Sequence, residues 1–244
     1  MIDLLAPNPS PITLSGTHTY LLGETHVMVI DPGPMIPEHL EAILNAIKGK
    51  KLAKILLTHH HPDHAGGARF LQEKTEAPIL AYVHSPFSPA LPINDGEKID
   101  CNGIVLQAIH TPGHTRDHLC FFQKDEKALF TGDLVLGEGS TTINPPDGDL
   151  IAYMQSLEKI KNLGVEKIFP AHGPSPVLPK RIEEMIAHRK ERHQQILKCI
   201  EQKITSPKEI VKRVYKEIPS ALIPFAIKNV EAHLYAIQKG FFSL

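Results

Sequence analysis

The sequence of 244 residues contains no tryptophan and only three cysteines, Cys101, Cys120 and Cys199, which lie far apart and form no CxxC pair. An odd number of widely spaced cysteines excludes a disulfide scaffold and a thiolate zinc knuckle. No apolar run approaches the roughly eighteen residues of a membrane-spanning helix. The first residues also lack the basic segment and continuous apolar stretch of a signal peptide. We therefore expect a cytoplasmic protein with no membrane partner.

The composition is that of an ordinary globular protein, with 42% apolar residues, 22% charged residues and a formal net charge of −1. The charge is unevenly distributed along the chain. Residues 1–174 carry 13 Lys and Arg against 20 Asp and Glu, whereas residues 175–244 carry 13 against 7. We predict two domains, an acidic one over residues 1–176 and a basic one over residues 177–244.

Short runs of β-branched and apolar residues predict many strands and few helices in the first domain. Besides two strands around Gly23-Glu24, the predicted strands are 54–57, 79–83, 104–109, 119–122, 128–130 and 167–169, and the predicted helices are 38–47 and 151–163. The alternation is too irregular for a βα barrel or a doubly wound sheet. It favours the α+β class, with sheets covered by helices.

The second domain is helical in pattern, with helices predicted over 180–202, from Ser206 onward, and over 225–239. A basic helical segment is compatible with a helix-turn-helix or winged-helix module that contacts nucleic acid. It is equally typical of a packing element or a dimer arm, and structural packing is the favoured interpretation. We expect deletion of residues 180–244 to leave turnover of a small generic substrate detectable.

Histidine is unusually frequent, with fifteen residues, and the densest group is Thr58-His59-His60-His61-Pro62-Asp63-His64. This segment follows an apolar strand. Alternate side chains of an extended segment share a side, so His59 and His61 converge while His60 faces away. The turn after Pro62 brings Asp63 and His64, at the start of a helix, to a second point nearby. Nitrogen and oxygen donors of this kind suit zinc, iron or manganese.

Three further segments place a potential ligand at the end of a predicted strand. They carry His114 in a Pro-Gly turn, Asp133 in Thr131-Gly132-Asp133, and His172 in Ala171-His172-Gly173. The carboxylate of Asp133 has two oxygens and is able to bridge two cations. Together these residues predict a metal centre built from several strand ends.

The set HxHxDH, GHT, GDL and AHG resembles the metallo-β-lactamase superfamily over roughly residues 10–175. The resemblance implies an αββα sandwich, and resemblance to one branch of the superfamily implies a small, helical, winged-helix-like domain after it. It further implies one metal on His59, His61 and His114, a second on Asp63, His64 and His172, and Asp133 bridging the two. An Asp at the bridging position is similar to the glyoxalase II and ribonuclease side of the superfamily, since the antibiotic-hydrolysing lactamases typically use Cys there.

Four other segments are similar to a branch that contains bacterial metallohydrolases and a β-lactamase-like endoribonuclease. They are 16–23, 137–142, 153–157, and His188-Arg189 with Arg192.

The expected cofactor is a pair of Zn²⁺ ions per chain, with iron or manganese also suited to the donor set. The expected nucleophile is a hydroxide that bridges the two ions, and Asp63 is the expected catalytic residue that orients it. His60, His118 and Asp31 are expected to support the ligands through hydrogen bonds, with Asp31 the preferred partner of a ligand imidazole. The remaining candidates, His18, His26, His84 and His110, are interpreted as ordinary polar histidines.

The substrate class stays open at this point. The basic C-terminal segment slightly favours RNA-type phosphodiesters. The alternative is a glyoxalase II-type thioesterase that acts on a small acyl thioester. A non-enzymatic nucleic-acid-binding protein with structural metals is disfavoured, because structural zinc sites normally have four protein ligands and no open position. The oligomeric state is also left open by the sequence.

Overall fold

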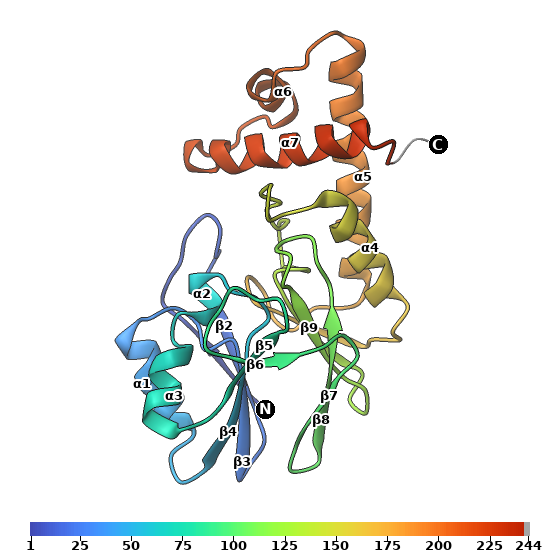
Figure 1. Cartoon of the computed structure of the whole chain (residues 1–244). Coiled ribbons are helices and arrows are strands. Elements are labelled where there is room, and N and C mark those ends of the chain that lie inside the picture. The colour runs from blue at the N-terminus through green and yellow to red at the C-terminus, as the bar shows by residue number, and fades with distance from the viewer. Residues whose placement is uncertain (242–244) are drawn as a thin grey trace.

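The computed structural model describes residues 1–241, in which two β-sheets lie face to face between two layers of helices (Figure 1). The first sheet contains, in spatial order, β1 (Ile2–Leu5), β2 (His18–Leu22), β3 (His26–Ile30), β4 (Lys51–Leu56), β5 (Ile79–Tyr82) and β6 (Leu91–Ile93). The second contains β11 (Lys167–Pro170), β10 (Ala128–Gly132), β9 (Leu119–Gln123), β8 (Ile104–His110) and β7 (Lys98–Cys101). This is the αββα sandwich that the resemblance implies.

The central strands are apolar on both faces because each sheet is covered on both sides. Along β3, Met28 and Ile30 enter the core between the sheets, while Val27 and Val29 pack against the outer helices. The same alternation occurs along β9. A continuous apolar run therefore packs into two hydrophobic cores, one on each face of the sheet.

Each sheet has its own helical layer. The helices α1 (Pro37–Ala46) and α3 (Ala68–Thr75) cover the first sheet, and the short α2 (Pro62–Ala65) precedes α3. The second sheet is covered by α4 (Leu150–Lys161) and the first half of α5 (Lys180–Glu201). The chain then forms α6 (Pro207–Val214), the short 3₁₀ helix η1 (Ser220–Leu222) and α7 (Ile223–Gln238). Among residues 1–241, no helix combines the length and hydropathy that crossing a bilayer requires.

The predicted α+β class is confirmed, and all the predicted strands and helices are present with ends shifted by a few residues. The strands that the sequence did not predict are β1, β6 and β7. β1 and β6 are short and largely exposed, and β7 buries only two of its four residues, so few of their side chains carry the apolar signal on which prediction depends. Helix α3 was also missed, since only its residues Ala68 and Leu71 are buried.

The C-terminal helices share a hydrophobic core with the sandwich. Ile182 and Met185 of α5 and Ala232 of α7 lie in the cluster that also buries Tyr153 and Leu157 of α4. The C-terminal part of α5 and another face of α7 form a separate hydrophobic cluster with α6. The boundary predicted at residue 176 falls between β11 and α5, and the core continues across it. Deletion of residues 180–244 would uncover the apolar face of α4, which argues against the expectation that turnover survives this deletion.

The shared core predicts that a cavity in α5 destabilises the whole sandwich. Met185→Ala, at a residue 1% exposed, should lower the free energy of unfolding by about 2–5 kcal/mol in a single cooperative transition followed by circular dichroism. The control is Leu178→Ala, at a residue 65% exposed, which should change little. An early, separate transition confined to the C-terminal helices would contradict this prediction.

Candidate metal centre

The side chains of the centre follow strands whose carboxyl ends lie at one edge of the sandwich. β10 runs parallel to β11, and β8 has the same direction because both β8 and β10 are antiparallel to β9. His114, Asp133 and His172 follow these three strands, and His59 follows β4 of the other sheet. The two sheets thus deliver their polar side chains to one place.

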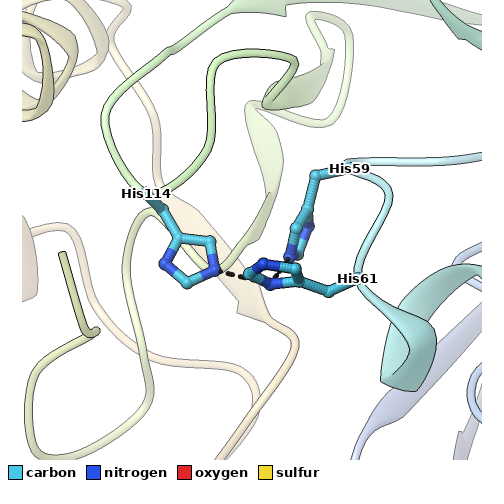
Figure 2. A group of neighbouring side chains, drawn as sticks. All are labelled: His59, His61 and His114. Atoms are coloured by element: carbon cyan, nitrogen blue, oxygen red, sulfur yellow. Dashed lines mark hydrogen bonds between the residues drawn. The ribbon is translucent and has the colours of Figure 1, made fainter. Parts of the chain in front are cut away.

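The first group consists of His59, His61 and His114, whose imidazoles point toward one another (Figure 2). His61 Nδ1 lies 2.9 Å from His59 Nε2 and 3.0 Å from His114 Nε2. His60 turns away from them, as predicted, and its Nδ1 lies 2.9 Å from a carboxylate oxygen of Asp117. Three nitrogen donors from two loops therefore face a common point.

The second group consists of Asp63, His64 and His172. The Oδ2 atom of Asp63 lies 3.6 Å from His64 Nε2 and 3.4 Å from His172 Nε2. The turn at Pro62 begins α2, and it carries Asp63 and His64 away from the strand direction of His59 and His61. The local sequence thus separates the two groups.

The carboxylate of Asp133 lies between the two groups. Its Oδ1 atom is 3.3 Å from His64 Nε2 and 3.2 Å from His172 Nε2, while its Oδ2 atom is 3.4 Å from His114 Nε2. Each oxygen therefore faces a different group, as a bridging ligand requires.

Several of these polar atoms are buried without a hydrogen-bond partner in the described part of the chain: His64 Nε2, His172 Nε2 and Asp133 Oδ1. Buried polar atoms are almost always paired, so three orphaned atoms at one point need a common partner. Borderline nitrogen donors and carboxylate oxygens are the donor set of zinc, iron and manganese. The residues therefore fit a metal pair.

The protonation of the imidazoles follows their surroundings. Burial and the neighbouring imidazoles hold the pKa of His59 well below its usual value and lower that of His61 to about 4. Both are neutral at neutral pH, which is the form that binds metals. Burial also disfavours the charged forms of His64 and His172, but the carboxylates of Asp63 and Asp133 outweigh it and raise both pKa values. The second group therefore has the more negative electrostatic environment, which favours a cation there.

Two of the predicted supporting residues contact the centre directly. A carboxylate oxygen of Asp31 lies 2.8 Å from His64 Nδ1, and the same carboxylate accepts hydrogen bonds from the backbone and hydroxyl of Thr58. His118 Nε2 accepts a hydrogen bond of 3.1 Å from the backbone N–H of Asp133. Burial lowers the pKa of His118 to about 3, so this imidazole is neutral and able to accept.

Some contacts around the centre were not predicted from the sequence. Asp117, which holds His60, also accepts a hydrogen bond from the Ser85 hydroxyl. The backbone oxygens of Thr142 and Gly16 lie 2.8 Å and 3.0 Å from the Nδ1 atoms of His114 and His172. Backbone acceptors have no residue-type signature, so only the fold reveals them.

Two of the histidines interpreted as ordinary have partners outside the centre. His18 Nδ1 lies 2.7 Å from Asp3, and His110 stacks on the ring of Tyr82 at a centroid distance of 4.0 Å.

Residues 12–172 match the family described as the metallo-beta-lactamase superfamily, and residues 206–238 match the beta-lactamase associated winged helix domain. The chain belongs to the metallo-beta-lactamase superfamily. It is 36% identical to a beta-lactamase-like protein 2 homolog of Drosophila melanogaster, over 98% of this chain and 88% of that protein. It is thus a metal-dependent hydrolase of this superfamily.

Two further similarities are to a protein named as a thioesterase and to a solved structure. The chain is 36% identical to the atrochrysone carboxyl ACP thioesterase dmxR1 of a Cryptosporiopsis species, over 83% of this chain and 63% of that protein. A metallo-beta-lactamase family protein of Thermus thermophilus superposes with a TM-score of 0.82 at 24% identity, covering 98% of this chain and 93% of that chain. The latter structure shares the fold of this chain along nearly its whole length, the C-terminal helices included.

The contact of Asp31 with His64 generates a prediction for metal affinity. Asp31 has a φ of 48°, a left-handed conformation that Asn tolerates, so Asp31→Asn changes the charge without straining the backbone. The loss of a carboxylate acceptor should weaken metal binding by about 10–100-fold, measured by competition with a chelator. Asp100→Asn, at an exposed position of β7, is the control. Equal metal affinity of the two variants would refute the supporting role of Asp31.

Proposed function

We propose that the protein hydrolyses acyl thioesters with an apolar acyl group, at a centre that holds two zinc ions. His59, His61 and His114 would bind one ion, Asp63, His64 and His172 the other, and Asp133 both. The distances of the Asp133 oxygens to the two groups and the orphaned atoms around them support this ligand set. When bound, a zinc pair supplies an activated water at neutral pH and stabilises negative charge on a reacting carbonyl oxygen.

Asp63 is suited to orient the attacking water. Its side chain is 27% exposed, whereas those of His64 and His172 are fully buried, so Asp63 is the part of the second group that faces solvent. The oxygen of the water bonds to the thioester carbonyl carbon, and the carbon–sulfur bond breaks. The leaving sulfur takes the electron pair of that bond and a proton that originates from the water. Burial opposes the ionisation of Asp63, but the neighbouring His64 and His172 lower its pKa to about 2, so it stays a carboxylate that accepts a hydrogen bond from the attacking water.

The observation that carries the choice of substrate is a cavity of about 290 Å³ with Asp133 in its wall. It lies between the segments 11–14 and 136–142 and the C-terminal residues 215–229. Its large apolar lining residues are Ile12, Leu14, Leu136, Ile218, Leu222 and Phe225, beside uncharged polar ones such as Ser140, Thr142 and Asn229. Glu138 is the only charged side chain besides Asp133, and neither lysine nor arginine lines the cavity within residues 1–241.

This lining favours an acyl group over a phosphodiester. Nucleic-acid sites depend on Lys and Arg to neutralise phosphates, and an acidic residue would repel them. Apolar pockets with a few polar groups bind the apolar part of small molecules. The sequence slightly favoured RNA because of the basic C-terminal segment, but the basic side chains of that segment do not line the cavity. The similarity to a protein named as a thioesterase also supports the thioester.

The cavity predicts a dependence of rate on acyl length. Zinc-loaded protein should hydrolyse N-acetylcysteamine thioesters with a kcat/KM that rises about fourfold per added methylene until the cavity is filled, from about 0.8 kcal/mol per buried CH₂. Phe225→Ala should flatten this rise, because it removes part of the wall. Phe70→Ala, at a partly buried phenylalanine of α3, is the matched control.

The same assay should include single-stranded RNA and lactoylglutathione as further substrates. Asp63→Ala should be inactive and shows which turnover depends on the metal centre. Cleavage of RNA that Asp63→Ala abolishes, with no turnover of any thioester, would overturn the proposal in favour of a nuclease.

A further inference from the structure

Arg189 of α5 is a buried cation that the proposed reaction does not use. It is 2% exposed, and no carboxylate lies within salt-bridge distance of it among residues 1–241. A buried charge is unfavourable unless polar groups compensate it. Here the compensation comes from the backbone oxygen of Thr141, from Asn229 Oδ1 at 3.3 Å, and from the Tyr153 ring, whose centroid lies 5.1 Å from the guanidinium carbon.

Asn229 of α7 holds the same loop at its other end. Its Oδ1 atom accepts a hydrogen bond of 2.9 Å from the backbone N–H of Ile143 and the hydrogen bond from Arg189. The carbonyl of Thr141 and the N–H of Ile143 are therefore both fixed by side chains of the C-terminal helices. The residue between these two anchors is Thr142.

His114 meets the loop between those anchors. Its Nδ1 atom lies 2.8 Å from the Thr142 backbone oxygen and 3.0 Å from the Thr141 hydroxyl. A carbonyl only accepts, so Nδ1 carries the proton and donates, which leaves the lone pair on Nε2. That atom is the one that faces His61 and Asp133. The loop thus sets both the tautomer and the direction of the imidazole.

We propose that Arg189 and Asn229 are positioning residues for His114, which act through the loop of residues 141–143. The inference rests on the proposed role of His114 as a metal ligand. It gives the C-terminal helices a part in the metal centre that is distinct from packing. The competing explanation is that Arg189 only joins α5 to the sandwich.

The test compares zinc-loaded variants by two measurements that do not depend on turnover. The first is the rate at which zinc is lost to a chelator. The second is the ¹⁵N NMR signal of the His114 Nδ1–H group, identified by its absence in His114→Ala. Arg189→Met and Asn229→Leu remove the loop contacts while keeping similar volume. Asn229→Asp keeps acceptor oxygens for Ile143 and Arg189, so it serves as the conservative variant.

The matched control is Arg192→Met. Arg192 lies one turn further along α5, where it donates to the Val214 backbone oxygen at 2.7 Å and covers the Tyr215 ring. It therefore stabilises the C-terminal helices without touching the loop that holds His114.

We expect Arg189→Met and Asn229→Leu to lose zinc about 10–100-fold faster and to lose the His114 Nδ1–H signal. Asn229→Asp and Arg192→Met should retain both. Retention of the signal in Arg189→Met, with zinc loss no faster than in Arg192→Met, would overturn the inference and leave Arg189 a structural anchor.

The two proposals fail in different ways. Absence of thioester turnover by the unaltered protein would overturn the proposed substrate and would leave the comparison of zinc release intact. Absence of zinc retention by the unaltered protein would overturn both.

Discussion

The carboxylate of Asp133 lies between imidazoles that arrive from separate strand ends, and the arrangement of the centre depends on it. Its two oxygens face different groups, and His64, His172 and Asp133 itself leave polar atoms unpaired and buried. Such a cluster is unfavourable in an apolar interior unless cations compensate it. Metal binding therefore stabilises the native state as well as supplying the chemistry, because the unfolded chain has no preformed site.

The sheet topology makes this convergence possible. Asp133 directly follows Gly132, which has a φ of 47° and approaches its neighbours so closely that a Cβ would lie 2.8 Å from His118 Nε2 and from Thr58 Oγ1. Only glycine permits that approach. The backbone N–H of Asp133 can then donate to His118, and Thr58 remains bonded to Asp31. The conformation of one glycine thus connects supporting residues from both sheets.

Much of this organisation could be predicted from the sequence. Buried strands carry apolar side chains on consecutive positions, so they were recognised, whereas the exposed β1 and β6 carried too little of that signal. The residues of the two groups could be predicted because histidines cluster densely in one segment. The alternation around His60 assigns His59 and His61 to one group, and the turn at Pro62 assigns Asp63 and His64 to the other. The acceptors of His114 and His172 could not, since they are backbone oxygens supplied by distant segments. The resemblance singled out Arg189, but its burial could not be predicted, because an arginine among the charged residues of a helix is usually exposed.

The uneven charge of the chain suggested two separable domains, but the C-terminal helices share a hydrophobic core with the sandwich. Residues from the C-terminal helices enter the core over α4, line the cavity at Asp133, and contact the loop that holds His114. Lys208 and Lys212 lie instead beside a different groove, between α6 and α7, away from the metal ligands. The basic character of the segment therefore describes its outer surface, and its apolar inner surface forms part of the cavity at Asp133. The residues of the two groups follow the strands of the sandwich, whereas part of the cavity wall comes from the C-terminal helices. Proteins that share the centre and differ in these helices therefore present different cavities to a substrate.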